Sequence, residues 1–189
     1  MSRLIFILFL FFPIATLGVQ DISSDAFSFM LEPFLGYNKQ STTGSGTEEG
    51  EAKNLLFGTR LGGQFVGVQT GIDYRVATGN YFTTQGQRKY EYSQTAFGVF
   101  LGYATPFLLR PYFILQLSTK ASIIPNNTVR TLRGKGRLFG LSLFLSVCSL
   151  NLEYLSTEWN SIEEGGATRT LSDTDSKGVN FSVSWPFNF

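Results

Sequence analysis

The chain has 189 residues, which is the length of one domain, and its formal net charge of +1 gives no field that would attract nucleic acid. Charged residues make up 15 % of it, whereas soluble domains average about a quarter. Phenylalanine occurs 19 times and histidine never. The only cysteine, Cys148, excludes an intramolecular disulfide, and its role is not indicated. The sequence therefore predicts one aromatic-rich domain without a nucleic-acid partner.

The N-terminus has the three-part organisation of a secretory signal peptide. Arg3 precedes an apolar run over residues 4–17, and Gly18 is a small residue at the position where signal peptidase cleaves. The run is shorter than the about 20 residues that a membrane-spanning helix needs. We expect residues 1–18 to be removed and residues 19–189 to form the mature domain.

The mature chain is built from segments in which apolar residues alternate with small or polar ones. Successive side chains of a β-strand point to opposite faces, so each segment predicts a strand with one apolar and one mixed face. Most segments have about the 9–11 residues that a tilted strand needs to cross a membrane. The eight segments are Phe27–Tyr37, Leu55–Gly63, Val66–Val76, Tyr90–Tyr103, Pro111–Ala121, Arg137–Val147, Leu150–Trp159 and Val179–Phe189.

The connections between these segments alternate between long and short. The long polar ones span residues 38–53, 77–89, 122–136 and 160–176. In a meander, alternate connections lie at the same end, so the long loops share one rim. Because the interior of eight strands is too narrow for all the large apolar residues, their apolar faces must point outward into lipid. We predict an all-β fold, an eight-stranded antiparallel up-and-down transmembrane β-barrel; the alternative is a soluble, lipocalin-like barrel.

The mixed faces carry charges of nearly balanced sign that would meet inside the barrel. Buried charges are costly unless they are paired, so we expect a salt-bridged network that fills the lumen. The alternative is a pathway for ions or solutes lined by the same side chains. The residues are Glu32, Arg60, Asp73, Arg75, Lys120 and Glu153.

Large aromatic residues lie near the predicted strand ends. Tyrosine and tryptophan favour the interface between membrane and water, so we expect them to form an aromatic girdle. The residues are Tyr37, Tyr74, Tyr90, Tyr92, Tyr103, Trp159 and Trp185.

The last segment, VNFSVSWPFNF, ends on alternating large residues: Val183, Trp185, Phe187 and Phe189. It resembles the C-terminal assembly signal of bacterial outer-membrane barrels. Together with the predicted signal peptide, the eight segments and the sorted loops, it makes the chain similar to the small outer-membrane proteins of Gram-negative bacteria, the OmpA transmembrane-domain, OmpX and OmpW types. The resemblance implies a bacterial outer-membrane location and insertion by the barrel-assembly machinery with periplasmic chaperones.

The resemblance also bears on function. Enzymes of this architecture, such as lipid A palmitoyltransferase or the omptin protease type, use a catalytic histidine, which this chain lacks. We therefore expect a monomeric barrel with a largely plugged polar lumen and a structural or surface-interaction role through its four long extracellular loops, with no catalytic residue, cofactor or metal. The alternatives are a narrow channel for small or hydrophobic solutes, as in OmpW-like proteins, and an enzyme that works without histidine.

A basic group lies in a predicted long loop and at the start of the following strand. Arginine and lysine bind phosphates, so we expect these residues to contact outer-membrane lipids and lipopolysaccharide; the alternative is an ordinary solvated loop. The residues are Arg130, Arg133, Lys135 and Arg137.

Overall fold

The computed structural model describes residues 27–44, 48–84, 88–125 and 128–189. The predicted signal peptide, residues 1–18, lies outside these ranges. Among the described residues, no helix is long and apolar enough to span a membrane. Within the same ranges the chain forms the strands β1 Ser28–Thr43, β2 Gly50–Phe65, β3 Val68–Thr83, β4 Lys89–Tyr103, β5 Leu109–Ile124, β6 Arg130–Leu145, β7 Cys148–Glu164, β8 Ala167–Thr170, β9 Asp175–Ser184 and β10 Phe187–Asn188.

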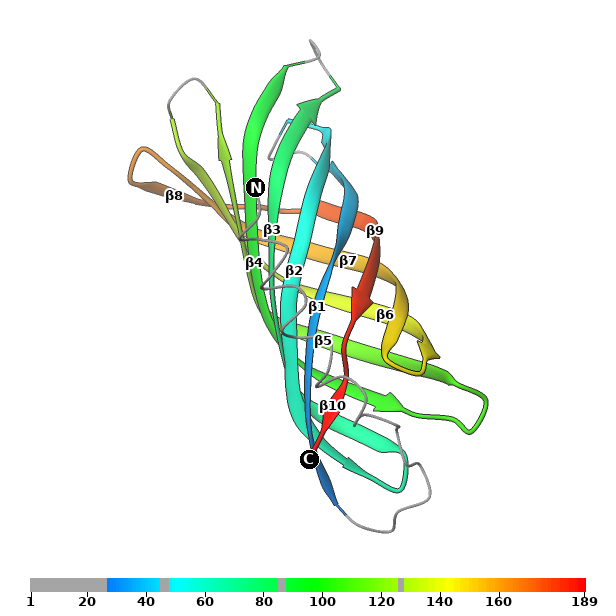
Figure 1. Ribbon diagram of the computed structural model, residues 1–189. Coiled ribbons are helices and arrows are strands. Elements are labelled where there is room, and N and C mark those ends of the chain that lie inside the picture. Colours follow the sequence, from blue (N-terminus) through cyan, green and yellow to red (C-terminus); the bar gives the residue numbers. More distant parts are fainter. Residues whose placement is uncertain (1–26, 45–47, 85–87, 126–127) are drawn as a thin grey trace, which may run out of the picture.

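The strands close into a barrel. Each of β1 to β7 pairs antiparallel with the next, and β9 pairs with both β7 and β1 (Figure 1). After an interruption at Trp185 and Pro186, β10 continues the pairing with β1, so that β9 and β10 together make the eighth strand of the barrel. The short β8 forms a hairpin with the end of β7. The prediction of a closed, eight-stranded, antiparallel up-and-down barrel is confirmed.

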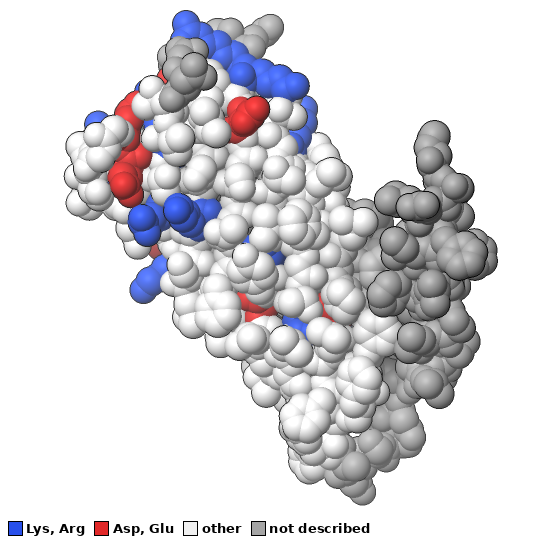
Figure 2. All heavy atoms as spheres, turned by 60° about the vertical axis from the view of Figure 1, so that its left-hand side comes forward, with Lys and Arg blue, Asp and Glu red and all other residues white. Residues whose placement is uncertain are grey.

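The barrel has its apolar side chains outside and its polar ones inside. Phe29, Leu55 and Phe139 are 66 %, 62 % and 59 % exposed, whereas Glu32 and Asn151 are completely buried. Figure 2 shows the consequence on one face: lysine, arginine, aspartate and glutamate gather toward one end of the molecule, and the other end is almost uncharged. The charged end includes the last residues of β1, β3 and β5 and the first residues of β2, β4 and β6 (Figure 1).

The strands reach further toward that end than the sequence predicted. Strands β1 to β7 have 15 to 17 residues, so most of each predicted long loop is strand. The prediction failed because these extensions are polar on their outer side, and their composition resembles that of a loop. Residues 160–176, for example, contain a hairpin whose turn is formed by Gly165 and Gly166, both with positive φ (58° and 84°). Glycine adopts such conformations without the steric cost that a Cβ imposes, and Gly-Gly is one of the pairs that this turn prefers.

A β-bulge in β5 changes which residues face the lumen. The register with β6 shifts between Gln116 and Thr119, and Leu117 and Ser118 are both exposed. One strand therefore has two consecutive residues on its outer side, and the alternation resumes with the opposite parity. Thr119 points inward with 1 % exposure, and Lys120 lies outside.

Candidate functional site

A network of buried charges fills the part of the lumen that is surrounded by the apolar exterior. Glu32 on β1 lies opposite Arg60 on β2, and Arg60 lies opposite Asp73 on β3. Arg60 donates to both carboxylates at 3.3 Å and reaches across the lumen to Oε1 of Glu153 on β7 at 2.6 Å. One guanidinium thus binds three carboxylates from three strands.

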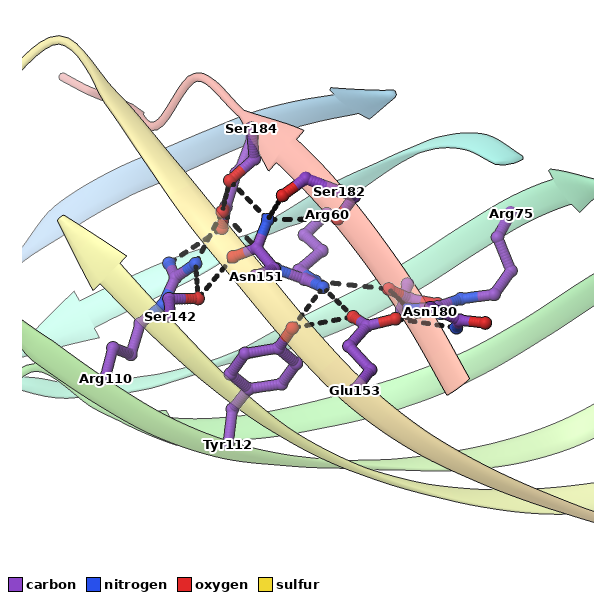
Figure 3. A network of polar contacts seen from close by, with 12 residues as sticks. Arg60, Arg75, Arg110, Tyr112, Ser142, Asn151, Glu153, Asn180, Ser182 and Ser184 are labelled. Atoms are coloured by element: carbon purple, nitrogen blue, oxygen red, sulfur yellow. Dashed lines mark hydrogen bonds and ion pairs between the residues drawn. The ribbon is translucent and has the colours of Figure 1, made fainter. Parts of the chain in front are cut away.

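A second arginine connects two of the same carboxylates. Arg75 on β3 donates from Nε and Nη2 to the two oxygens of Asp73 at 2.7 and 2.8 Å. Its Nη1 donates to Oε2 of Glu153 at 2.9 Å. This fork-shaped pairing fixes the orientation of both groups and adds a further connection across the barrel (Figure 3).

The third arginine was missed by the sequence analysis. Arg110 falls between the predicted strands Tyr90–Tyr103 and Pro111–Ala121, but it is the second residue of β5 and is 5 % exposed. It binds both oxygens of Glu32 and donates to Oγ of Ser142 at 3.0 Å. Its parity was a usable signal, because Arg110 lies two positions before the inward-facing Tyr112.

The structure brings five of the six predicted lumen charges together, namely Glu32, Arg60, Asp73, Arg75 and Glu153. The prediction for Lys120 is wrong, because the β5 bulge turns this residue outward. With Arg110 included, three arginines face three carboxylates, and the charges of the network cancel.

Neutral side chains satisfy the remaining oxygens. The Tyr112 hydroxyl donates to Oε1 of Glu153 at 2.6 Å, and Asn180 donates to its Oε2 at 2.8 Å. Ser184 on β9 donates to Oε1 of Glu32 at 2.6 Å. Such completion is what makes charges tolerable in a low-dielectric interior.

Two aromatic rings pack with their faces toward the Arg60 guanidinium. The Arg60 guanidinium lies 4.4 Å from the ring centre of Tyr112 and 5.1 Å from that of Phe34. The Tyr112 ring lies across the neighbouring strand at Gly140, where an added Cβ would come within 2.2 Å of it. Glycine at that position therefore makes room for the ring.

One small cavity lies beside the network. A cavity lined by Arg75, Gln116 and Asn180, among others, has a volume of about 10 Å³, close to the smallest that holds one water molecule. Nε2 of Gln116 is buried without a protein partner and is a hydrogen-bond donor that such a water would satisfy.

The charged end of the barrel has a different interior. A cluster of aromatic and aliphatic side chains occupies it, with Tyr81 and Tyr92 stacked at 6.1 Å between ring centres. Trp159 is 3 % exposed and donates from Nε1 to Oγ of Ser176 at 2.7 Å. We call this group the outer aromatic cluster; it comprises Ala52, Tyr81, Tyr90, Tyr92, Ala121, Ile123, Leu132, Trp159, Ile162 and Leu171.

The predicted aromatic girdle is therefore only partly on the outside. Tyr90, Tyr92 and Trp159 point into the barrel, because strand parity, not closeness to a strand end, decides the direction of a side chain. The residues that do face outward are Tyr37, Tyr74, Tyr103 and Trp185, with 37 % to 48 % exposure.

The residues of the predicted assembly signal lie along the closing edge of the barrel. Trp185 N donates to Pro33 O at 3.0 Å, and Phe187 pairs with Leu31. Phe189 and Phe29 exchange two backbone hydrogen bonds of 2.9 and 3.0 Å. The last residue of this edge is Phe189, with 76 % exposure, and Val183 lies in the ladder before it.

The predicted lipopolysaccharide contacts lie on β6 and not in a loop. Arg133, Lys135 and Arg137 are exposed on the outer face of the strand. Arg130 is half-buried and forms ion pairs with Glu48 and Glu164 at 3.3 and 2.8 Å. In the part of the chain that the structure describes, no group of three His, Cys, Asp or Glu residues is arranged to hold a metal.

Neither a protein-family model nor a curated protein matches the sequence. Solved structures do match. Neisserial surface protein A is 17 % identical, with 84 % of this chain and 97 % of that one covered and a TM-score of 0.53. The attachment invasion locus protein Ail of Yersinia pestis, in complex with a heparin analogue, is 10 % identical, with 84 % and 99 % covered and a TM-score of 0.57. The outer membrane protein OprG from Pseudomonas aeruginosa is 14 % identical, with 88 % and 98 % covered and a TM-score of 0.50.

At these identities the matches establish architecture. They agree with the strand count, the closure of β9 on β1 and the apolar exterior described above. The chain has the fold of the small eight-stranded outer-membrane β-barrel proteins.

Proposed function

We propose that this protein is an integral outer-membrane β-barrel with a sealed lumen and that it acts through its outer surface, as a structural or surface-interaction protein. The observation that carries the proposal is the charge-neutral network of Arg60, Arg75 and Arg110 with three carboxylates. Every one of these residues is at most 5 % exposed. A lumen filled in this way has no open path for a solute.

The apolar exterior supports the membrane location. Residues such as Phe29 and Leu55 are exposed on the outer faces of neighbouring strands, which water would penalise and hydrocarbon favours. Closure removes the unpaired strand edges that lipid cannot satisfy. A cleaved signal peptide over residues 1–18 fits export to the outer membrane.

The closing edge supports a role in assembly. Phe187 and Phe189 end the eighth strand against β1, so the barrel is closed only when this segment is in place. We propose that Val183, Trp185, Phe187 and Phe189 are recognised by the barrel-assembly machinery, after periplasmic chaperones have delivered the chain. With its edges closed, the barrel needs no second copy, and we propose a monomer.

The outer aromatic cluster and the ion-pair network lie one after the other along the lumen. A solute would have to displace the outer aromatic cluster and then separate Arg60 from Glu153, which are 2.6 Å apart. Separating a buried pair leaves uncompensated charge, at a cost of about 3–5 kcal/mol. This argues against a channel for small or hydrophobic solutes. The paired state of the buried carboxylates likewise argues against an enzyme that uses them as acid or base.

Planar-bilayer recording of the purified, refolded mature chain tests the sealed lumen. We expect no unitary currents above those of the bilayer, with a porin refolded in the same detergent as the positive control. Reproducible unitary currents would overturn the sealed barrel and favour the narrow channel. Currents that change in Arg60→Ser would place the pathway through the network.

A further inference from the structure

Four cations lie side by side on the outer face of the barrel. Lys120 on β5 is the direct cross-strand partner of Arg133 on β6, and Lys135 and Arg137 follow at alternate positions of β6. All four are exposed. We call this group, Lys120, Arg133, Lys135 and Arg137, the β5–β6 patch.

The β5 bulge creates the patch. Without the extra residue, Lys120 would point into the lumen and Thr119 would lie outside. The bulge instead places a lysine directly beside Arg133. Like charges directly opposite each other on a sheet destabilise it, so this arrangement favours an anion that binds both side chains.

The charges of the patch are only partly compensated. Arg133 pairs with Glu163 at 3.3 Å and Arg137 with Glu158 at 3.7 Å, both between exposed side chains. Among the described residues, no ion pair is recorded for Lys120 or Lys135. Lys135 lies opposite Glu158 on β7 without forming an ion pair with it, whereas Lys120 lies opposite Thr95 and Arg133. Both lysines therefore have donors available for a ligand.

Other lysines at the same boundary are compensated. Lys39 lies two residues after the apolar Tyr37 on β1, and Lys53 two residues before Leu55 on β2. Both bind Glu51, at 3.1 and 2.9 Å. Lys177 likewise binds Asp175 at 2.7 Å. The β5–β6 patch thus differs from the rest of the boundary in charge, and Lys53 provides a matched control.

The patch begins where the apolar exterior ends. Phe139, two residues from Arg137 on the same face, is 59 % exposed, and Leu117, within the bulge, is 45 % exposed. Leu115 is the cross-strand partner of Arg137. In a membrane, this boundary lies at the level of the lipid head groups.

We propose that the β5–β6 patch binds the phosphate groups of an outer-leaflet glycolipid whose acyl chains lie along Phe139 and Leu115. The proposal rests on the membrane location given under Proposed function, with the charged end of the barrel facing the outside. From Arg133 to Arg137 the patch extends about 13 Å along the strand, which suits a lipid with more than one phosphate. The proposed site differs in one residue from the contacts predicted from the sequence. Arg130 is left out because it is already paired with Glu48 and Glu164, and Lys120 takes its place.

The test is lipid binding by the refolded mature chain in nanodiscs of neutral phosphatidylcholine. Diphosphorylated lipid A is titrated and its retention measured by native mass spectrometry, beside monophosphorylated and dephosphorylated lipid A. We expect affinity to fall with each phosphate removed. In the double variant K120Q/K135Q it should fall about tenfold or more, because two charge-assisted hydrogen-bonding groups are lost. K53Q should bind like the wild type.

Equal affinity of K120Q/K135Q and wild type would overturn the patch, and equal binding of dephosphorylated lipid would overturn phosphate recognition. Competition by millimolar inorganic phosphate as strong as that by lipid A would show a free-anion site instead. All variants change exposed side chains, and their folding is checked by heat-modifiable gel mobility. A chain that stays monomeric and soluble without detergent would refute the membrane location itself, whereas an inserted barrel without patch-dependent binding would refute only this inference.

Discussion

The two halves of the barrel interior are filled in opposite ways, and the exterior changes with them. On β7, the inward Glu153 lies between the outward Leu152 and Tyr154, whereas the inward Trp159 lies between the outward Glu158 and Asn160. The strand thus exchanges its apolar and polar faces between one half and the other.

The same exchange occurs on β2. Inward Arg60 is followed by outward Leu61, but inward Ala52 lies between the outward Glu51 and Lys53. Where the outer face is apolar, a polar network can fill the narrow lumen; where the outer face is polar, the strands bury an ordinary apolar core. The point of exchange marks where the surroundings change from hydrocarbon to water.

The largest effect is expected from breaking the ion-pair network, in the half of the lumen that the apolar exterior surrounds. In Glu153→Leu, Arg60 and Arg75 each lose an ion pair, and Tyr112 and Asn180 lose their acceptors. Uncompensated buried charge should lower the free energy of unfolding by about 4 kcal/mol. Urea unfolding of the refolded barrel in lipid vesicles, followed by tryptophan fluorescence, measures the change.

The exposed Glu158→Gln on the same strand is the control and should change stability by less than about 0.5 kcal/mol. Equal losses of unfolding free energy for Glu153→Leu and Glu158→Gln would contradict the view that the ion-pair network stabilises the barrel.

The half that contains the outer aromatic cluster should be destabilised less by the loss of a side-chain hydrogen bond than by the loss of side-chain volume. Trp159→Ala removes the largest side chain of the outer aromatic cluster and should cost about 3 kcal/mol. Trp159→Phe keeps most of the volume and loses the hydrogen bond to Ser176, at a cost of about 1 kcal/mol. The same unfolding experiment, followed by gel mobility instead of fluorescence, gives the ratio. If both variants were equally unstable, the hydrogen bond and not the packing would hold this half.

The packing of Tyr112 against the glycines around it should have a smaller effect on stability, within the half of the lumen that holds the ion-pair network. Gly140→Ala would place a Cβ 2.2 Å from the ring and should destabilise the barrel by about 2 kcal/mol. Gly102→Ala would bring a Cβ only to 3.2 Å of the Tyr112 Cβ, and a smaller loss is expected. Thermal unfolding by gel mobility compares the two, and a larger loss for Gly102→Ala would show that the ring does not depend on Gly140.

Period-two alternation was enough to predict the barrel and the direction of most side chains, because strand geometry leaves two faces only. Residues such as Glu32 and Asp73, each between apolar neighbours, were thereby placed in the lumen. Lys120 was misplaced because a bulge shifts parity by one residue, and no composition marks Leu117 and Ser118 as its site.

Other features depended on where the surroundings change. Trp159 was expected on the membrane surface on the premise that the whole strand faces lipid. Beyond the apolar exterior the strand faces water, and the large apolar residues point inward as in a soluble barrel. The hairpin of β7 and β8 was readable, since Gly165-Gly166 is a recognised turn signal between alternating segments. Arg110 was not predicted to face the lumen because it lies just outside a predicted strand, and strand boundaries are the part of such a prediction that is most often wrong.

The smallest effect on stability is expected in the turn between β2 and β3, away from the ion-pair network and the outer aromatic cluster. Val66 and Gly67 connect the paired residues Phe65 and Val68, and both have positive φ (48° and 77°). A two-residue turn of this kind favours Asn-Gly, whereas a β-branched residue is strained in the left-handed region. Val66→Asn should therefore stabilise the barrel by about 0.5–1 kcal/mol, measured as a rise in the temperature of the gel-mobility transition. Val147→Asn, at an exposed turn position without positive φ, should give no gain; an equal gain there would mean that removing an exposed apolar side chain, and not relief of strain, is responsible.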